Sequence, residues 1–120
     1  MPRLTGPDFI AIQTEDLQAA KAFYGDRLGL PVLQETPDAV VFDSKLAPFA
    51  VRKPLVDPEA AQGKLGWGVA LWFGCDDADA LHEELKAAGI AIAFPPKAGP
   101  FGRYFAFRDP FGYTITVHTA

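Results

Sequence analysis

The sequence FIAIQTEDLQAAKAFYGDRLGLPVL, residues 9–33, decides the fold, because its pattern returns in VALWFGCDDADALHEELKAAGIAIAF, residues 69–94. Each copy opens with an apolar run that predicts a β-strand, and an aspartate that can cap a helix follows it. An amphipathic helix comes next, and a glycine ends it by taking up the left-handed backbone conformation. A pattern that recurs in this way predicts two copies of one structural unit.

The predicted elements follow the same order in both copies. In the first copy the first strand covers residues 9–12 and the helix residues 17–28. In the second copy the strand covers residues 69–73, and the helix runs from its aspartate cap through Leu81, Leu85 and Ala88. The residues that bound the helices are Asp16 and Gly29, then Asp76 or Asp77 and Gly89. Further strands are predicted at residues 30–34, 39–42 and 49–52, and at residues 90–94, 104–108 and 113–118. Clusters of Pro, Gly and Asp predict turns at residues 36–38, 95–100 and 109–112.

A stretch without clear periodicity, residues 54–66, separates the copies and is typical of a linker. We therefore predict an α+β fold in a single domain, residues 1–120, with module one at residues 8–53 and module two at residues 67–120. Because the first strand of each module is apolar at every position, both of its faces need cover. Two βαβββ modules are thus expected to pair and to form a cup-shaped mixed sheet.

Composition excludes several classes of partner. The net charge is −4 and no run of Lys or Arg concentrates positive potential, so nucleic acid is not an expected partner. No apolar stretch has the length of a signal peptide or a membrane span, so we expect a cytoplasmic protein that binds no membrane. Cys75 is the only cysteine, which excludes an internal disulfide and predicts a small buried residue at a strand end. We expect His82 on the solvated face of the second helix.

These motifs resemble the vicinal oxygen chelate superfamily, which includes glyoxalase I, fosfomycin-resistance proteins, extradiol dioxygenases and bleomycin-resistance proteins. The resemblance spans nearly the whole chain and rests on the order and spacing of short motifs: Asp16-Leu17, Ala22-Phe23-Tyr24, Leu28-Gly29-Leu30, Asp76-Asp77, Ala88-Gly89 and Asp109-Pro110-Phe111-Gly112. Residues 100–110 look most like the bleomycin-resistance branch. The resemblance implies a homodimer in which two chains exchange modules and form two clefts at the subunit interface.

The resemblance also indicates where metal ligands would lie. Metal-dependent members carry His, Gln or Glu on the first strand of each module and Glu on the last strand. The matching positions here are Phe9, Ala70 or Val69 depending on which aspartate caps the second helix, and Thr116. A divalent ion needs about three good nitrogen or oxygen donors, so we expect no metal cofactor. A displaced site built from Gln13 and His118 would supply two donors, which is too few.

The alternation of side chains along the strands predicts one concave surface. Its expected residues are Phe9, Ala11, Gln13, Ala70, Trp72, Gly74, Tyr104, Ala106, Thr114, Thr116 and His118. Phe105 and Phe107 then point at the helices, whereas Trp67 and Phe101 lie at strand entrances and form a rim. Aromatic faces with a few polar groups suit a flat, conjugated ligand. The candidate ligand-binding residues are therefore Phe9, Gln13, Trp67, Trp72, Phe101, Tyr104, Thr116 and His118.

The function predicted from these features is metal-independent binding and sequestration of a small aromatic natural product or antibiotic, as in drug resistance. The predicted protein is a homodimeric binding protein and no residue is assigned a catalytic role. One alternative is a glyoxalase- or dioxygenase-like lyase or isomerase, with a relocated metal site or with metal-free acid–base chemistry at Tyr104 or His118. Another is a structural or regulatory module whose cup is closed by its partner.

Overall fold

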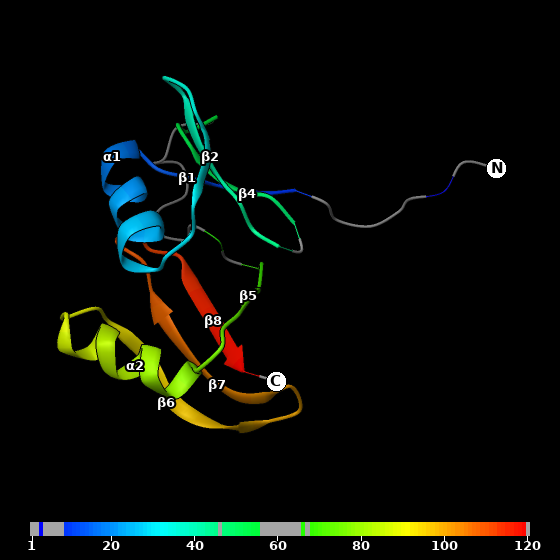
Figure 1. The fold of residues 1–120 in the computed structure, drawn as a ribbon, viewed down its shortest axis with the longest axis vertical. Helices are drawn as coiled ribbons and strands as arrows, with labels where there is room; N and C mark the ends of the chain where they lie inside the picture. Colours follow the sequence, from blue (N-terminus) through cyan, green and yellow to red (C-terminus); the bar gives the residue numbers. More distant parts are fainter. Residues whose placement is uncertain (1–2, 4–8, 46, 56–65, 67, 120) are drawn as a thin grey trace. The chain divides into compact units, whose positions relative to one another are not determined.

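The computed structural model describes residues 3, 9–45, 47–55, 66 and 68–119 (Figure 1). The chain forms two compact units, Met1–Ala60 and Ala61–Ala120. Each unit holds one four-stranded mixed sheet, so the predicted α+β class is confirmed. Among the described residues, no helix is long and apolar enough to cross a membrane.

The first unit contains the first copy of the repeated pattern. Its elements are β1 (Ile10–Gln13), α1 (Leu17–Ala20), the π-helix η1 (Lys21–Arg27), β2 (Val32–Glu35), β3 (Ala39–Phe42) and β4 (Phe49–Arg52). The strand order is β1-β4-β3-β2. β1 and β4 run parallel, and the other neighbouring strands run antiparallel.

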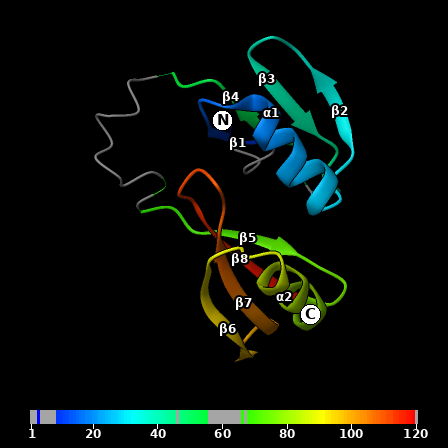
Figure 2. The same ribbon diagram turned by 90° about the vertical axis from the view of Figure 1, so that its left-hand side faces the viewer.

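The second unit repeats this arrangement. Its elements are β5 (Leu71–Gly74), α2 (Ala78–Ala87), β6 (Ile92–Gly99), β7 (Gly102–Arg108) and β8 (Thr114–Thr119). The strand order is β5-β8-β7-β6, and β5 and β8 are the parallel pair. α2 packs on one face of this sheet (Figure 2). Because the two orders correspond strand for strand, the prediction of two βαβββ modules is confirmed.

Aspartate caps begin both helices, as predicted. The side chains of Asp16 and Asp77 each accept a hydrogen bond from the backbone N–H three residues further on, at 2.9 and 3.0 Å. Asp77, and not Asp76, is therefore the cap of α2. Gly29 and Gly89 follow the helices with φ angles of 82° and 80°, a left-handed conformation that other residues adopt only at a cost.

The helix predicted over residues 17–28 is α-helical only as far as Ala20 and continues as the π-helix η1. Its wider turns accompany the burial of two adjacent rings, Phe23 and Tyr24, which are 5% and 0% exposed. The Tyr24 ring meets the Phe49 ring of β4 at 5.0 Å. The apolar pattern in the sequence cannot separate these two helix types, because their residue periods differ too little over so short a segment.

Strand alternation places large side chains of the second sheet beneath α2. Phe105, Phe107 and Val117 are all buried. The Phe105 ring meets the ring of His82 on α2 at 5.4 Å and lies 6.2 Å from the Phe107 ring. The prediction that Phe105 and Phe107 face the helix is therefore confirmed.

The prediction of a turn at residues 95–100 is wrong, because β6 runs through Pro95 and Pro96 as far as Gly99. β6 is an edge strand of its sheet, and its pairing with β7 shifts register between Phe94 and Lys97. Proline lacks an N–H and is tolerated in strands at edges and bulges. The prolines thus occupy a part of the sheet where a missing donor costs little.

The prediction of an exposed His82 is also wrong. His82 is only 7% exposed, and its Nδ1 lies 3.3 Å from the Glu83 carboxylate at the rim of the helix. It shares a helix face with the buried residues Ala78 and Leu85, because residues three and four positions apart lie on the same side. In the sequence, the acidic residues next to His82 make it look like part of the exposed face of the helix.

Candidate ligand-binding face

The face of the β5-β8-β7-β6 sheet opposite α2, which we call the open face, carries two rows of side chains. Residues paired across neighbouring strands point to the same face of a sheet. The first row consists of Trp72, Thr116, Ala106 and Phe94, and the second of Gly74, His118, Tyr104 and Lys97. Four candidates from the sequence, Trp72, Tyr104, Thr116 and His118, therefore share one face.

Four rings on this face contact one another, and we call them the aromatic cluster: Trp72, Phe101, Tyr104 and His118. The Trp72 ring stacks on Tyr104 with a centroid distance of 5.5 Å and an interplanar angle of 24°. Phe101 and His118 meet Trp72 edge to face at 5.8 and 5.7 Å. Both geometries are favourable for aromatic pairs. Because Trp72 and Tyr104 already stack on each other, a flat ligand would lie on the cluster and not between these rings.

Much of the aromatic cluster faces solvent. Trp72 is 43% exposed and Phe101 is 61% exposed, whereas Tyr104, Thr116 and His118 are half-buried. Adjacent exposed rings are more informative than scattered ones, since contiguous apolar patches mark interaction sites. Covering such rings with a ligand removes apolar surface from water, at about 25 cal/mol per Å².

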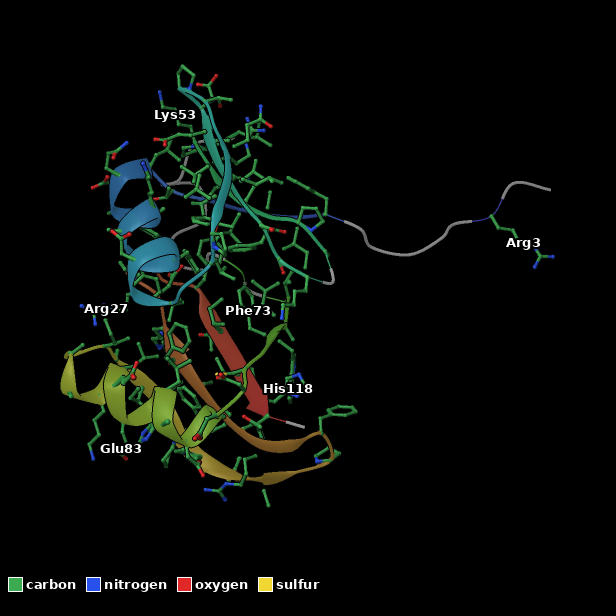
Figure 3. All side chains as sticks on the ribbon, viewed as in Figure 1. Arg3, Arg27, Lys53, Phe73, Glu83 and His118 are labelled. Atoms are coloured by element: carbon green, nitrogen blue, oxygen red, sulfur yellow. The ribbon has the colours of Figure 1, made fainter. Side chains whose placement is uncertain are left out.

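The imidazole of His118 is held in a defined orientation at the C-terminal end of β8 (Figure 3). Its Nδ1 lies 3.2 Å from the backbone carbonyl oxygen of Phe101. A carbonyl oxygen can only accept a hydrogen bond, so Nδ1 carries the proton and donates it. In the neutral ring, Nε2 then keeps its lone pair and can accept a hydrogen bond from a ligand.

Gly99 makes room for the Tyr104 ring. A Cβ atom added at Gly99 would overlap Cε1 of Tyr104 and lie 2.7 Å from its Cδ1. Phe94 also meets the Tyr104 ring, edge to face, at 5.5 Å. Gly99 and Phe94 together hold Tyr104 in position to stack on Trp72.

The remaining candidates from the sequence lie outside the aromatic cluster. Phe9 and Gln13 belong to the first unit, where Phe9 directly precedes β1 and is 50% exposed. The Gln13 side chain accepts a hydrogen bond from the backbone N–H of Leu55 at 3.0 Å. Trp67 lies outside the described residues.

The metal positions that the resemblance implies hold residues that cannot bind a metal well. Because Asp77 caps α2, the counterpart of Phe9 in the second unit is Ala70, and Thr116 stands on β8. One hydroxyl is the whole donor set at these positions, which does not fit a divalent ion. In the part of the chain that the structure describes, no group of three or more His, Cys, Asp or Glu residues could hold a metal.

Cys75 directly follows β5 and is half-buried. Burial raises the pKa of its thiol, and the negative charge of Asp76, whose Oδ1 lies 3.7 Å from the sulfur, adds to the rise. A thiol with a raised pKa is a poor nucleophile at neutral pH. We therefore assign Cys75 no role in the candidate site.

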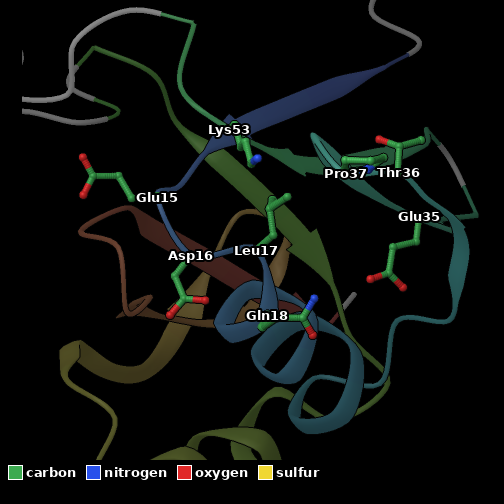
Figure 4. A pocket seen from close by; sticks show the side chains of 8 residues that line it. All are labelled: Glu15, Asp16, Leu17, Gln18, Glu35, Thr36, Pro37 and Lys53. Carbon is green, nitrogen blue, oxygen red and sulfur yellow. The ribbon is translucent and has the colours of Figure 1, made fainter.

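A polar hollow of about 460 Å³ opens on the first unit (Figure 4). The residues that line it are Glu15, Asp16, Leu17, Gln18, Glu35, Thr36, Pro37 and Lys53. Three of its four charged side chains are already engaged: Asp16 caps α1, Glu35 pairs with Lys21 at 2.9 Å, and Lys53 lies 3.8 Å from Asp38. The hydrogen bond and the charge of Lys21 lower the pKa of Glu35. The hollow is a weaker candidate than the open face.

Three residues of the open face were missed among the candidates from the sequence: Phe94, Lys97 and Arg108. Arg108 pairs with Thr114 across β7 and β8, so the alternation that placed Tyr104 and Ala106 could have found it. Phe94 and Lys97 were hidden by the predicted turn at residues 95–100, because the bulges of β6 break the simple alternation.

Comparison with known proteins identifies the family. The model of the Glyoxalase/Bleomycin resistance protein/Dioxygenase superfamily matches residues 6–117. The chain belongs to this superfamily. The match runs through both units, and it confirms the family expected from the motifs.

The proteins that resemble this chain carry names that describe different roles, or none. The chain is 26% identical over 106 residues to the uncharacterized protein YetH of Bacillus subtilis (strain 168), covering 86% of this chain and 88% of that protein. The bleomycin-binding protein of Streptomyces verticillus, in a complex with copper(II)-bleomycin, matches with 22% identity and a TM-score of 0.68, covering 100% and 99% of the two chains. A lactoylglutathione lyase from Agrobacterium tumefaciens matches with 23% identity and a TM-score of 0.72, covering 98% and 96%. These structures share the fold, which by itself does not choose between binding and catalysis.

Proposed function

We propose that the protein binds and sequesters a small, planar aromatic molecule, such as an antibiotic or another natural product, on the open face of its second unit and without a metal. The observation that carries this proposal is the aromatic cluster, in which exposed Trp72 is surrounded by Phe101, Tyr104 and His118. Aromatic faces supply most of the contact area for a flat ligand, and a few polar groups fix its orientation. Thr116 and the Nε2 atom of His118 are those polar groups.

The poor donor set at the metal positions supports binding over metal-assisted chemistry. The superfamily's name covers glyoxalases, bleomycin resistance proteins and dioxygenases. A metal ion in such enzymes would act as a Lewis acid or activate water. Phe9, Ala70 and Thr116 cannot hold one, which leaves recognition of the ligand as the function that the site supports best.

Fluorescence titration tests the proposal. In Trp67→Phe the emission reports on Trp72, and a bound aromatic ligand is expected to quench it saturably. The panel consists of bleomycin-type, mitomycin-type and enediyne-type compounds, and native mass spectrometry of the purified protein detects any ligand that co-purifies. The matched control, Trp72→Phe, keeps only Trp67 and should show less quenching. No saturable response to any compound, together with no co-purifying mass, would overturn the proposal.

A second candidate function is metal-free acid–base catalysis, and the orientation of His118 favours it. The hydrogen bond from Nδ1 to the Phe101 carbonyl holds the ring and leaves Nε2 as the basic atom. Mass spectrometry of the ligand after prolonged incubation separates the two functions. Sequestration predicts that the ligand is recovered unchanged, whereas catalysis predicts a product whose formation is lost in His118→Asn.

The proposal includes a homodimer. Exposed Trp72 and Phe101 form an apolar surface that is costly to leave in water, and a partner chain or a bound ligand would cover it. We expect light scattering to give twice the mass of one chain, which is 13.0 kDa. A mass of 13.0 kDa at every protein concentration would show a monomer and would remove this part of the proposal.

A further inference from the structure

The charged side chains of the second unit are divided between the two sides of its sheet. Its carboxylates belong to α2, to the turn before α2, and to the β7–β8 turn, and within residues 68–119 they are Asp76, Asp77, Asp79, Glu83, Glu84 and Asp109. Along the same residues, no strand position on the open face holds a carboxylate. Lys97 and Arg108 do stand there, because Lys97 pairs with Tyr104 and Arg108 with Thr114.

Lys97 is positioned beside the aromatic cluster. Its Nζ lies 4.5 Å from the centroid of the Phe94 ring and 5.4 Å from that of Tyr104, which is the ring stacked on Trp72. Among the described residues, no carboxylate lies within 4.0 Å of this ammonium group. Its contacts with ring faces leave its three N–H donors available for an acceptor.

Arg103 and Arg108 show the contrast between the two sides of the sheet. Arg103 makes two hydrogen bonds to the Asp79 carboxylate of α2, at 3.2 and 3.3 Å. Arg108 is exposed, and within the described residues it has no carboxylate within 4.0 Å. The charge of Arg103 on the helix side is thus paired with a carboxylate, whereas that of Arg108 on the open face is not.

We infer that the aromatic ligand of the open face carries a negative charge, which Lys97 and Arg108 recognise; this inference rests on the proposed function. The net charge of the chain is −4, which by itself disfavours an anion. However, charges more than about 8 Å apart are largely screened at physiological ionic strength. The side chains nearest to the ligand therefore decide whether an anion or a cation binds better. Both charged strand residues of the open face are positive: Lys97 lies beside the aromatic cluster, and Arg108 stands four residues along β7 from Tyr104. They complement a planar aromatic carboxylate, sulfonate or phenolate.

Three naphthalene derivatives of the same shape test the inference. They are 2-naphthoate, which is an anion, 2-naphthamide, which is neutral, and 2-naphthylmethylammonium, which is a cation. Isothermal titration calorimetry of the full chain at neutral pH and low salt is expected to give the anion about tenfold higher affinity than the cation, and added salt should reduce the difference.

Lys97→Gln and Arg108→Gln should each lower naphthoate affinity by about three- to fivefold and leave naphthamide binding unchanged. Lys86→Gln, on α2, is the matched control and should change neither.

The outcomes separate this inference from the proposed function. If the three compounds bind alike, or if the cation binds best, the preference for an anion is overturned while aromatic binding stands. If none of them binds, the open face does not hold a planar aromatic molecule of this size and the inference is overturned, whereas the proposed function is decided by the fluorescence panel and the co-purifying mass. An unchanged naphthoate affinity in both Lys97→Gln and Arg108→Gln would show that these side chains do not recognise the charge.

Discussion

Replacing Asp109 with alanine is expected to lower the free energy of unfolding by about 2–5 kcal/mol. Its side chain is only 5% exposed, and Oδ1 accepts hydrogen bonds from the backbone N–H groups of Phe111 and Tyr113 at 2.9 and 2.8 Å. Alanine would leave both donors without their partner in the turn between β7 and β8. Each unsatisfied buried donor costs about 1–3 kcal/mol.

Thermal and urea denaturation followed by circular dichroism measure this loss, and Asp109→Asn is the matched control. The asparagine side chain keeps an oxygen that can accept both hydrogen bonds but carries no charge, so we expect it to lose much less stability than alanine. A loss below about 1 kcal/mol in Asp109→Ala would show that the turn does not depend on the carboxylate. Equal losses in the two variants would show that the charge, and not the acceptor, is what matters.

Replacing Trp72 with alanine is expected to lower the affinity for an aromatic ligand by at least tenfold, which corresponds to about 1.4 kcal/mol. Trp72 is the only ring that contacts all three other members of the aromatic cluster among the described contacts. It also presents a large exposed aromatic surface. Its loss removes the largest stacking surface and the support for Tyr104. Isothermal titration calorimetry measures the change, using whichever compound binds the unmodified protein.

A second variant changes the cluster without deleting a ring. In Gly99→Ala the added methyl group overlaps the Tyr104 ring and must displace it from Trp72, so ligand affinity should fall. Gly74→Ala is the matched control, because a Cβ at this open-face position meets no atom within 4 Å. Affinity that is unchanged in both Trp72→Ala and Gly99→Ala, with the fold intact by circular dichroism, would show that the ligand binds elsewhere.

Much of the fold could be predicted because local rules act within each module. An aspartate before an amphipathic segment and a glycine after it bound both helices, at Asp16 and Gly29 and at Asp77 and Gly89. Strand alternation placed Phe105 toward α2 and Tyr104 on the open face, because successive side chains of a strand point to opposite sides. The wrong predictions fall where contacts between distant residues override local pattern. Phe105, on β7, packs against the ring of His82, and this contact places His82 in the interior although it lies on α2 among charged residues.

The candidate site, too, was predictable from the sequence only in part. Residue types at the metal positions follow from the sequence alone, and so does the presence of aromatic residues at alternate strand positions. The stacking of Trp72 on Tyr104 across the intervening strand, the space that Gly99 leaves, and the position of Lys97 above two rings all depend on the register of the strands. The anionic preference inferred for the ligand was therefore not accessible from composition, whose net charge points the other way.

The sequence by itself determined the repeated βαβββ module, the helix ends and the side of the sheet to which most strand residues point. These features depend on steric and hydrogen-bonding rules that act over a few residues. Only the tertiary structure decided that Pro95 and Pro96 lie in an edge strand, that His82 is buried, and that Trp72 lies within contact of three other rings. The physical reason is that each of these outcomes depends on which strands become neighbours, and neighbouring strands bring together side chains that lie far apart in the chain.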